Sequence, residues 1–329
     1  MNYNLNSGYG MLQATALAAA GPSFGRILVC MPAADPNYDT IADIVKADPD
    51  GDVRLFTTVA AAYAAAETNR NDVIMLSANA SHPLTEMLTV SKNRVHFVGM
   101  DMGDRQTGQG SRLVMGVTAA ATDIAAVKVT GVRNSFRNIK IESSNTVAQG
   151  LYALVDAGEY TLYKNCSFLK LTDLDQATAA DVVAEGDGTT WINCELGAAT
   201  LLTTAARPTV LIDKVVGTTG MLDNNFINCN FVSYTSADKN LIKVAAAGDG
   251  QRYAMFRGCS FINWEIAAGG SVITDAINAP SGSELYIILD ANCITVGCTN
   301  IATATTNVGV YVNAAVPTAA TSGIAVNAA

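Results

Sequence analysis

The four residues "NCSF" at positions 165–168 return along the chain with small changes. Related stretches are "NCEL" at 193–196, "NCNF" at 228–231 and "GCSF" at 258–261. Their cysteines follow one another at steps of 28, 35 and 30 residues. A nearly fixed period of roughly 20–50 residues is typical of a solenoid or an array of structural repeats. The recurrence therefore predicts one structural unit that is used again and again.

One position of this repeat holds a cysteine, and the neighbouring positions repeat with it. The cysteines in question are Cys166, Cys194, Cys229, Cys259 and Cys293. Each of them follows an asparagine or a glycine: Asn165, Asn193, Asn228, Gly258 and Asn292. The earlier stretch "FRNIKI" (136–141) has the same layout, with Ile139 in place of the cysteine. The repeat therefore extends upstream of the first "NC" pair.

Residue alternation indicates that the repeated unit consists of strands. In "YKNCSFLKL" (163–171), Cys166, Phe168 and Lys170 share one parity, and a period of two is typical of a strand. A second strand-like series keeps nearly the same step: "LYALVD" (151–156), "DVVAE" (181–185), "TVLID" (209–213), "NLIKVAA" (240–246), "SVITDAI" (271–277) and "VGVYVNA" (308–314). The units show no amphipathic helix pattern, which excludes ankyrin, tetratricopeptide and leucine-rich repeats, and they are too short for propeller blades.

These observations predict an all-β chain that forms a single-stranded, right-handed parallel β-helix, a solenoid. Equivalent residues of successive coils then lie above one another, about 4.8 Å apart. We expect Cys166, Cys194, Cys229 and Cys259 to form an inward stack, and Asn165, Asn193 and Asn228 to form a ladder at a turn. The right-handed winding follows from the general handedness of parallel crossovers.

The two ends differ from the repeats. We expect residues 53–300 to form a capping helix followed by the β-helix, with the helix in "VAAAYAAAE" starting after Thr57 or Thr58. Residues 1–52 are expected to form an N-terminal arm. Residues 301–329 contain no Lys, Arg, Asp or Glu, so this C-terminal strand and tail are expected to lie at a subunit interface.

The low content of charged residues and the negative net charge argue against two classes of binding partner. Only 15% of residues are charged, against roughly 25% in an average domain, and the formal net charge is −9. Nucleic acid and anionic membrane surfaces are therefore not expected as partners, because binding to either depends on clustered Lys and Arg. No apolar run is long enough for a membrane span.

Cysteine and histidine usage argues against a metal site. The chain has seven cysteines without a CxxC pair, and its two histidines are His82 and His96. We expect buried free thiols, as in a protein that assembles in a reducing cytoplasm, and we expect no cofactor. His82 is expected in a loop and His96 in a strand.

The segment "VRLFTTVAAAYAAAETNRNDVIMLSANASHPLTEMLTVSKNRVHFVGMD" (53–101) resembles the entry to β-helical phage proteins. With the arm before it and the repeats after it, the chain is similar to the tailspike-like head-decoration proteins of tailed bacteriophages. This resemblance implies a homotrimer on the virion capsid surface, assembled in the host cytoplasm. It also implies that the N-terminal region, residues 1–52, binds the major capsid protein.

Cleavage of a polysaccharide would usually require two facing carboxyl groups, so the acidic residues are the candidates for catalysis. Candidate carboxyl groups are Asp173, Asp175, Glu185, Asp187, Asp213, Asp223 and Asp275. None matches the acidic and basic motifs of polygalacturonase-like enzymes. Asp173 and Asp175 are typical of a solvated polar loop, and Glu185 and Asp187 of a turn between coils. We therefore expect no enzymatic activity and no catalytic residues. Trp264 is expected at a subunit contact, where tryptophan is enriched, although stacking on a sugar is the other use of an exposed tryptophan.

The predicted role is a structural phage virion protein, a trimeric capsid decoration or cement protein. The alternative is a phage tailspike or receptor-binding β-helix that binds or cleaves host polysaccharide. A host surface glycan is a further partner that either role allows.

Overall fold

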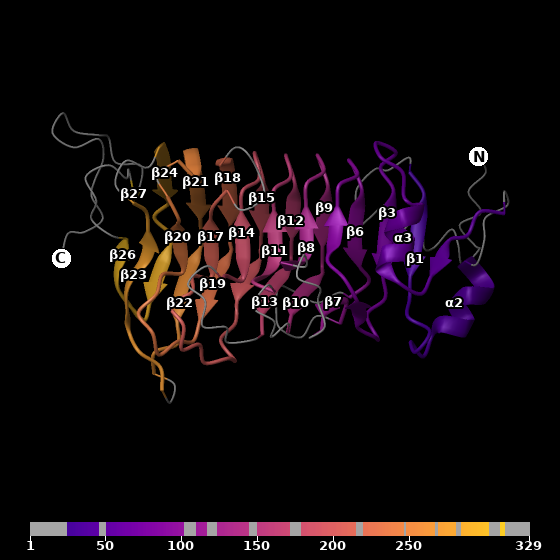
Figure 1. Ribbon diagram of the computed structural model, residues 1–329, viewed down its shortest axis with the longest axis horizontal. Coiled ribbons are helices and arrows are strands. Elements are labelled where there is room, and N and C mark those ends of the chain that lie inside the picture. Colours follow the sequence, from indigo (N-terminus) through magenta and orange to yellow (C-terminus); the bar gives the residue numbers. More distant parts are fainter. Residues whose placement is uncertain are drawn as a thin grey trace.

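The computed structural model shows an elongated shaft of stacked coils, with residues 27–30 near one end and residues 298–302 near the other (Figure 1). The structure describes residues 25–45, 51–101, 110–116, 124–144, 150–171, 179–214, 220–246, 248–266, 269–280, 284–302 and the backbone of 310–312. The predicted arm therefore falls largely outside the described residues, as do residues 303–309 and 313–329 of the predicted tail.

Three parallel sheets form the walls of the shaft, and the chain visits them in turn, one strand in each per coil. Sheet 1 runs in the order β2 (Leu55–Phe56), β1 (Ile27–Cys30), β3 (Val73–Leu76), β6 (His96–Gly99), β9 (Ser135–Arg137), β12 (Leu162–Lys164), β15 (Thr190–Ile192), β18 (Met221–Ile227), β21 (Gly250–Arg257), β24 (Glu284–Leu289) and β27 (Val310–Val312).

Sheet 2 runs in the order β4 (His82–Leu84), β7 (Arg112–Met115), β10 (Lys140–Ser143), β13 (Ser167–Lys170), β16 (Glu195–Gly197), β19 (Asn230–Ser233), β22 (Ser260–Asn263) and β25 (Ile294–Val296). Sheet 3 runs in the order β5 (Leu88–Val90), β8 (Ala125–Val129), β11 (Tyr152–Asp156), β14 (Val182–Ala184), β17 (Val210–Ile212), β20 (Ile242–Val244), β23 (Ile273–Asn278) and β26 (Cys298–Ala302). Every strand pair is parallel, so the fold is a parallel β-helix, in agreement with the prediction from the repeat.

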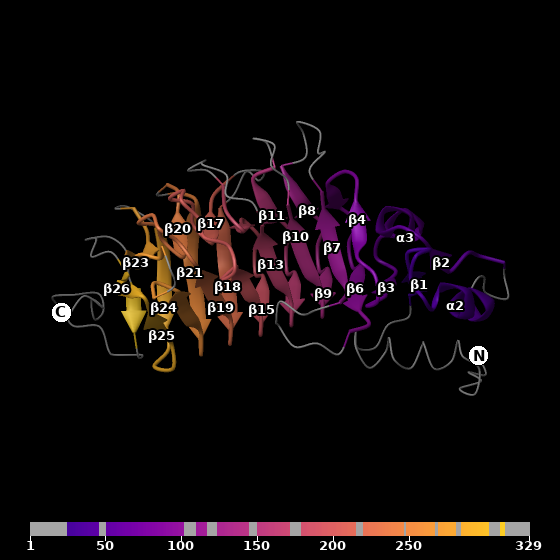
Figure 2. The same cartoon turned by 90° about the horizontal axis from the view of Figure 1, so that it is seen from below.

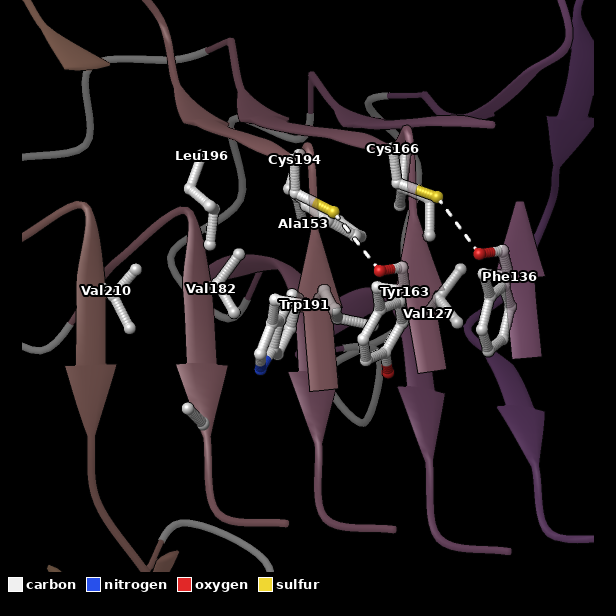
Figure 3. Packing of buried hydrophobic residues seen from close by; sticks show 14 of the residues in the cluster. Val127, Phe136, Ala153, Tyr163, Cys166, Val182, Trp191, Cys194, Leu196 and Val210 are labelled. Atoms are coloured by element: carbon white, nitrogen blue, oxygen red, sulfur yellow. Dashed lines mark hydrogen bonds between the residues drawn. The ribbon is translucent and has the colours of Figure 1, made fainter. Parts of the chain in front are cut away.

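The interior is built from columns of like side chains, because the strands pair in register. Tyr163 of β12 pairs with Phe136 of β9 on one side and with Trp191 of β15 on the other. The rings of Tyr163 and Trp191 stack at a centroid distance of 4.1 Å (Figure 3). The whole column consists of Tyr63, Phe97, Phe136, Tyr163, Trp191, Phe226 and Phe256. Such a column buries a large apolar area in each coil.

The turn between sheets 1 and 2 is made by left-handed residues, and we call it the asparagine corner (Asn138, Asn165, Asn193, Asn228 and Gly258). All five have φ between 52° and 59°, a region that asparagine and glycine enter more readily than other residues. The Nδ2 of Asn165 donates to Oδ1 of Asn138 at 3.1 Å, and the Nδ2 of Asn193 donates to Oδ1 of Asn165 at 3.2 Å. The side-chain amides thus bond from coil to coil along the shaft.

Two helices lie at the N-terminal end, α2 (Tyr38–Val45) and α3 (Val59–Ala65) (Figure 2). Thr58 is the N-cap of α3, and its Oγ1 accepts a hydrogen bond from the Ala61 N–H at 3.2 Å. The Tyr63 ring begins the aromatic column, and its hydroxyl oxygen accepts the backbone N–H groups of Ser91 and Lys92, each at 2.7 Å. That α3 serves as the cap of the shaft stays a prediction.

Two expectations about strands were wrong. The segment 308–314 was placed in the series that forms sheet 3, but β27 pairs with β24 in sheet 1, and β26 ends sheet 3 instead. The irregular last step of 37 residues is explained by this change of sheet. His82 lies in strand β4 and is buried, not in a loop. A buried polar side chain needs hydrogen-bond partners. His82 has two, because its Nδ1 lies 3.5 Å from Cys30 Sγ and its Nε2 lies 3.0 Å from the Ser77 carbonyl oxygen.

Candidate functional site

The cysteines of the repeat lie in successive coils, and the first four of them are fully buried. Each thiol donates to the carbonyl of the aromatic residue one coil earlier, as in the contacts of Cys166 with Phe136 at 3.4 Å and of Cys194 with Tyr163 at 3.6 Å (Figure 3). Burial raises the pKa of Cys194 well above its usual value. Burial also acts to raise the pKa of Cys229, but hydrogen bonds with Cys194 and Cys259 lower it well below its usual value. All four thiols are enclosed in the core, where they pack as small apolar groups and act as weak donors.

The acidic residues that the sequence singled out lie in different places. Asp173 and Asp175 are outside the described residues. Glu185 is buried, and Asp275 accepts a hydrogen bond from Asn300 at 3.0 Å. Asp213 is half-buried near the end of β17, and burial raises its pKa. Two pairs of the described candidates lie in successive coils. Glu185 follows β14 and Asp213 follows β17, which pair with each other, and Asp187 forms a parallel bridge with Leu222, the residue before Asp223.

Asp187 and Asp223 belong to a group that we call the charged corner (Arg133, Glu159, Tyr160, Asp187, Asp223 and Arg252). It lies where sheet 3 passes into sheet 1. Parallel bridges join Glu159 to Asp187 and Asp187 to Leu222, the residue before Asp223, so these members lie in successive coils. Four of the residues have a left-handed backbone, with φ of 59° at Arg133, 54° at Tyr160, 51° at Asp223 and 62° at Arg252. In the remaining coil this left-handed position is taken by Gly188, with φ of 63°.

Tyr160 occupies the middle of the charged corner. Its side chain is 58% exposed, and the Arg133 guanidinium carbon lies 5.8 Å from the ring centroid. The ring packs on the backbone of the next coil, where a Cβ atom on Gly188 would lie 2.7 Å from Tyr160 Cδ1. The glycine therefore makes room for an aromatic side chain on the outside of the shaft.

The two aspartates of the charged corner differ in their electrostatics. Asp223 Oδ2 accepts a charge-assisted hydrogen bond from Arg252 Nη1 at 2.6 Å. Asp187 has no such cation in direct contact, and burial together with the charge of Glu159 raises its pKa. The Oδ1 atoms of both aspartates are enclosed and lack a hydrogen-bond donor. Both acids therefore retain acceptor capacity that the protein does not use.

A third carboxyl group lies just inside this corner. Asp156 is completely buried, and its oxygens accept the Tyr163 hydroxyl at 3.0 Å and the Thr189 hydroxyl at 2.9 Å. Burial raises the pKa of Asp156 to about 7, against the opposing effect of these hydrogen bonds and of the Gly158 N–H. The charged corner thus has an acidic group behind it that changes charge near neutral pH.

Sequence reasoning missed Arg133, Glu159, Tyr160 and Arg252. A signal was present, because "GEYTLY" (158–163) and "GDGTTW" (186–191) stand 28 residues apart, the same step as the first two cysteines. The aromatic column was also missed, although an aromatic residue stands three places before each of the first four cysteines.

Trp264 lies on the last coils of the shaft. It belongs to an apolar surface that we call the terminal-rung face (Ile262, Trp264, Ile294 and Val296). Val296 of β25 pairs with Ile262 of β22, and Trp264 follows β22 directly. Trp264, Ile294 and Val296 are 48%, 53% and 50% exposed. Six of the nine large apolar side chains that are exposed in the described part lie between 264 and 296, so exposed apolar surface is concentrated on the last coils.

No group of three or more His, Cys, Asp or Glu side chains in the described residues could hold a metal ion. No helix in the described ranges is long and apolar enough to cross a membrane. His96 lies in strand β6, with Nδ1 2.8 Å from Ser135 Oγ, and burial lowers its pKa.

Comparison with known proteins identifies the fold only. No family model and no curated protein matches the chain. Among solved structures, "Geobacillus virus E2 - ORF18" has a TM-score of 0.51 and 13% identity, and the match covers 78% of this chain and 53% of that one. Pectin methylesterase PemA from Erwinia chrysanthemi has a TM-score of 0.49 and 14% identity over 83% and 81% of the two chains. Pectate lyase Pel9A has a TM-score of 0.47 and 12% identity over 89% and 82%.

The expectation of no enzymatic activity is corrected by this comparison. Several of the matching structures are pectin methylesterases, and another is a pectate lyase. The expectation rested on the lack of polygalacturonase-like motifs, and that criterion cannot exclude catalysis in a fold that carries other carbohydrate chemistry. At this level of identity the similarity establishes the parallel β-helix alone.

Proposed function

We propose that this chain is a structural protein of a phage virion, and that it assembles as a homotrimer through the last coils of its shaft. The terminal-rung face carries the proposal. An exposed apolar surface of this kind on a soluble shaft marks a site of protein contact. The virus protein among the solved structures has a parallel arrangement of the same kind, which makes a phage setting consistent with the fold.

A copy of the same chain suits this surface as a partner. Each chain has a formal net charge of −9, so two copies repel unless they meet through uncharged surface. The four residues of the terminal-rung face are uncharged, and strand β25, which supplies two of them, contains only Ile, Thr and Val. Contact through this face buries apolar area without bringing like charges together.

The arrangement of apolar side chains favours a ring over a twofold dimer. A ring is built from two different faces of each subunit, whereas a twofold dimer uses one face twice. A second apolar surface exists on sheet 1 at the same level, where Tyr286 of β24 pairs with Tyr253 of β21 and is 51% exposed. In the proposed trimer the terminal-rung face of each subunit meets the tyrosine surface of the next.

Sedimentation velocity of the purified full-length chain tests this assembly. We expect a trimer for the wild type and a monomer for Trp264→Asp and for Tyr286→Asp. An equimolar mixture of the two variants should contain a heterodimer, because each variant keeps the face that the other lacks. The control Asp43→Ala, on the exposed side of α2, should remain trimeric. A wild-type monomer would contradict the proposal.

The position on the virion needs a second measurement. Cryo-electron microscopy of virions that carry or lack the protein should show its density on the head shell, as expected for a decoration protein bound to the major capsid protein. Density at the tail tip would instead support the alternative of a tailspike.

A further inference from the structure

A second apolar cluster lies outside the interior of the shaft, on the sheet 1 strands of its first coils. We call it the outer apolar face (Ile27, Val73, Met75 and Val98). These side chains alternate along β1, β3 and β6 with residues of the interior core, such as Ile74 and Phe97. Because successive side chains of a strand point to opposite faces of a sheet, the outer apolar face points away from the interior.

The pairing of the strands brings these four side chains together. Ile27 of β1 pairs with Val73 of β3, and Met75 of β3 pairs with Val98 of β6. The strands β1, β3 and β6 are neighbours in sheet 1 (Figure 1). The outer apolar face is therefore one continuous patch across three strands.

This patch is almost inaccessible to solvent although it points outward. Val73, Met75 and Val98 are each 1% exposed, and Ile27 is 8% exposed. In the part of the chain that the structure describes, Met100 is the partly buried apolar residue that packs against this cluster. One side chain is too small to remove four others from water, so the patch needs a larger cover.

The composition of residues 1–24, which we call the leading segment, suits such a cover. The leading segment contains no Lys, Arg, Asp or Glu and includes the stretch "MLQATALAAA" (11–20). Residues 102–109, which follow β6 closely, are the competing candidate, but they include Asp104 and Arg105. Burial against apolar surface favours the segment without charges, because a charge loses its hydration there.

The leading segment joins the shaft beside the outer apolar face. The Arg26 N–H donates to Asp72 Oδ1 at 2.7 Å, and the Arg26 carbonyl accepts the Val73 N–H at 2.8 Å. A Cβ atom on Gly25 would clash with the Asn71 carbonyl oxygen, so glycine permits the close approach of the two backbones. The chain is thus fixed against the start of β3 directly after the leading segment ends.

We propose that the leading segment docks on the outer apolar face of its own chain and covers it. The same chain is favoured over a neighbouring subunit, because a segment attached beside its binding surface has a high effective concentration there. The docking does not rest on the proposed trimer. Binding to the major capsid protein through residues 1–24 would require release of the leading segment from the shaft.

Methionine oxidation tests this cover, because Met75 and Met115 are equally buried in different places. Each is 1% exposed, Met75 on the outer apolar face and Met115 in the interior core. Hydrogen peroxide should oxidise both slowly in the full-length chain, as read by peptide mass spectrometry. Deletion of residues 1–24 should raise the rate at Met75 about tenfold or more and leave the rate at Met115 unchanged.

Addition of the missing segment as a peptide completes this experiment. A synthetic peptide of residues 1–24 should restore the protection of Met75 in the shortened chain, whereas a peptide of residues 102–109 should not. Met75 that stays protected after the deletion would overturn the proposal, because another segment would then provide the cover.

A full-length variant decides the question if the shortened chain does not fold, which rapid oxidation of Met115 would reveal. Val98→Asp places a charge within the outer apolar face without altering the interior core. We expect chymotrypsin to cleave within residues 1–24 about tenfold or more faster than in the wild type. Val272→Asp makes the same change at a 53% exposed side chain on the last coils and should be cleaved like the wild type. Equal cleavage of Val98→Asp and the wild type would overturn the docking.

The variant Trp264→Asp separates docking within one chain from exchange between subunits. Met75 should stay protected in this variant under conditions where sedimentation shows a monomer. Loss of protection in the monomer would assign the cover to a neighbouring subunit and would contradict docking within the same chain.

Discussion

The asparagine corner and the charged corner, which border sheet 1, share a left-handed backbone conformation but carry different side chains. The asparagine corner places Asn138, Asn165, Asn193 and Asn228 in the left-handed region, and the side-chain amides of the first three bond from coil to coil. The charged corner puts arginine, tyrosine and aspartate in that region, with two carboxylate oxygens left without donors. The amide ladder of the asparagine corner adds hydrogen bonds between coils, whereas the carboxylate oxygens without donors at the charged corner do not. The difference indicates that stability selects the residues of one corner but not those of the other.

The largest effect is expected behind the asparagine corner, in the aromatic column. Trp191 is fully buried between Tyr163 and Phe226, so Trp191→Ala leaves a large cavity. We expect a loss of about 3–5 kcal/mol in the free energy of unfolding, measured by chemical denaturation. The control Val53→Ala, at a side chain that is 57% exposed and outside both proposed contact faces, should lose less than about 0.5 kcal/mol. Equal losses would remove the proposed distinction between interior columns and outer surface.

Asp156, behind the charged corner, should make stability depend on pH. Its pKa is about 7 in the folded chain because of burial, against about 3.9 in an unfolded chain. The stabilisation is therefore complete below pH about 4 and is lost as the pH rises through 7, by on the order of 4 kcal/mol. Asp156→Asn should remove this slope, measured as denaturation midpoints from pH 4 to 8. Parallel profiles of wild type and variant would contradict the assignment.

Breaking the asparagine ladder should have an intermediate effect. Asn165→Ala removes hydrogen bonds to two neighbouring coils and places alanine in the left-handed region. We expect a loss of about 2–3 kcal/mol in the free energy of unfolding, from the two bonds and the backbone strain together. The exposed variant Glu159→Gln is the matched polar control and should be near neutral. A neutral Asn165→Ala would show that the ladder is dispensable.

The smallest effect is electrostatic and lies within the charged corner. The pKa of Asp187 is raised by burial and then by the charge of Glu159, so Glu159→Gln should lower it. Carboxyl carbon NMR titration of Asp187 measures this shift, and Asp238→Asn, which removes an exposed acid elsewhere, should leave it unchanged. An unaltered pKa of Asp187 in Glu159→Gln would mean that the two groups do not interact.

The repeat was readable from the sequence because stacked coils reuse the same side chain at the same place. The "NC" pairs predicted the parallel β-helix, since Asn and Cys recur only where one conformation and one volume recur. The charged corner was not predicted, because Arg133, Tyr160, Gly188 and Asp223 share a backbone conformation without sharing chemistry. The aromatic column of sheet 1 was missed for a related reason, because its tyrosine, tryptophan and phenylalanine residues pack in the same way but are different residue types.

A paired glycine substitution tests the contrast between the corners most directly. Asn165→Gly and Tyr160→Gly change the same backbone conformation in the same coil, and their free energies of unfolding can be measured side by side by urea denaturation. We predict that Asn165→Gly is less stable than the wild type by about 1 kcal/mol, because it loses the ladder, while Tyr160→Gly is equally stable or more stable by up to about 1 kcal/mol. A loss of stability in Tyr160→Gly as large as that in Asn165→Gly would contradict the claim that the charged corner is not maintained for the fold.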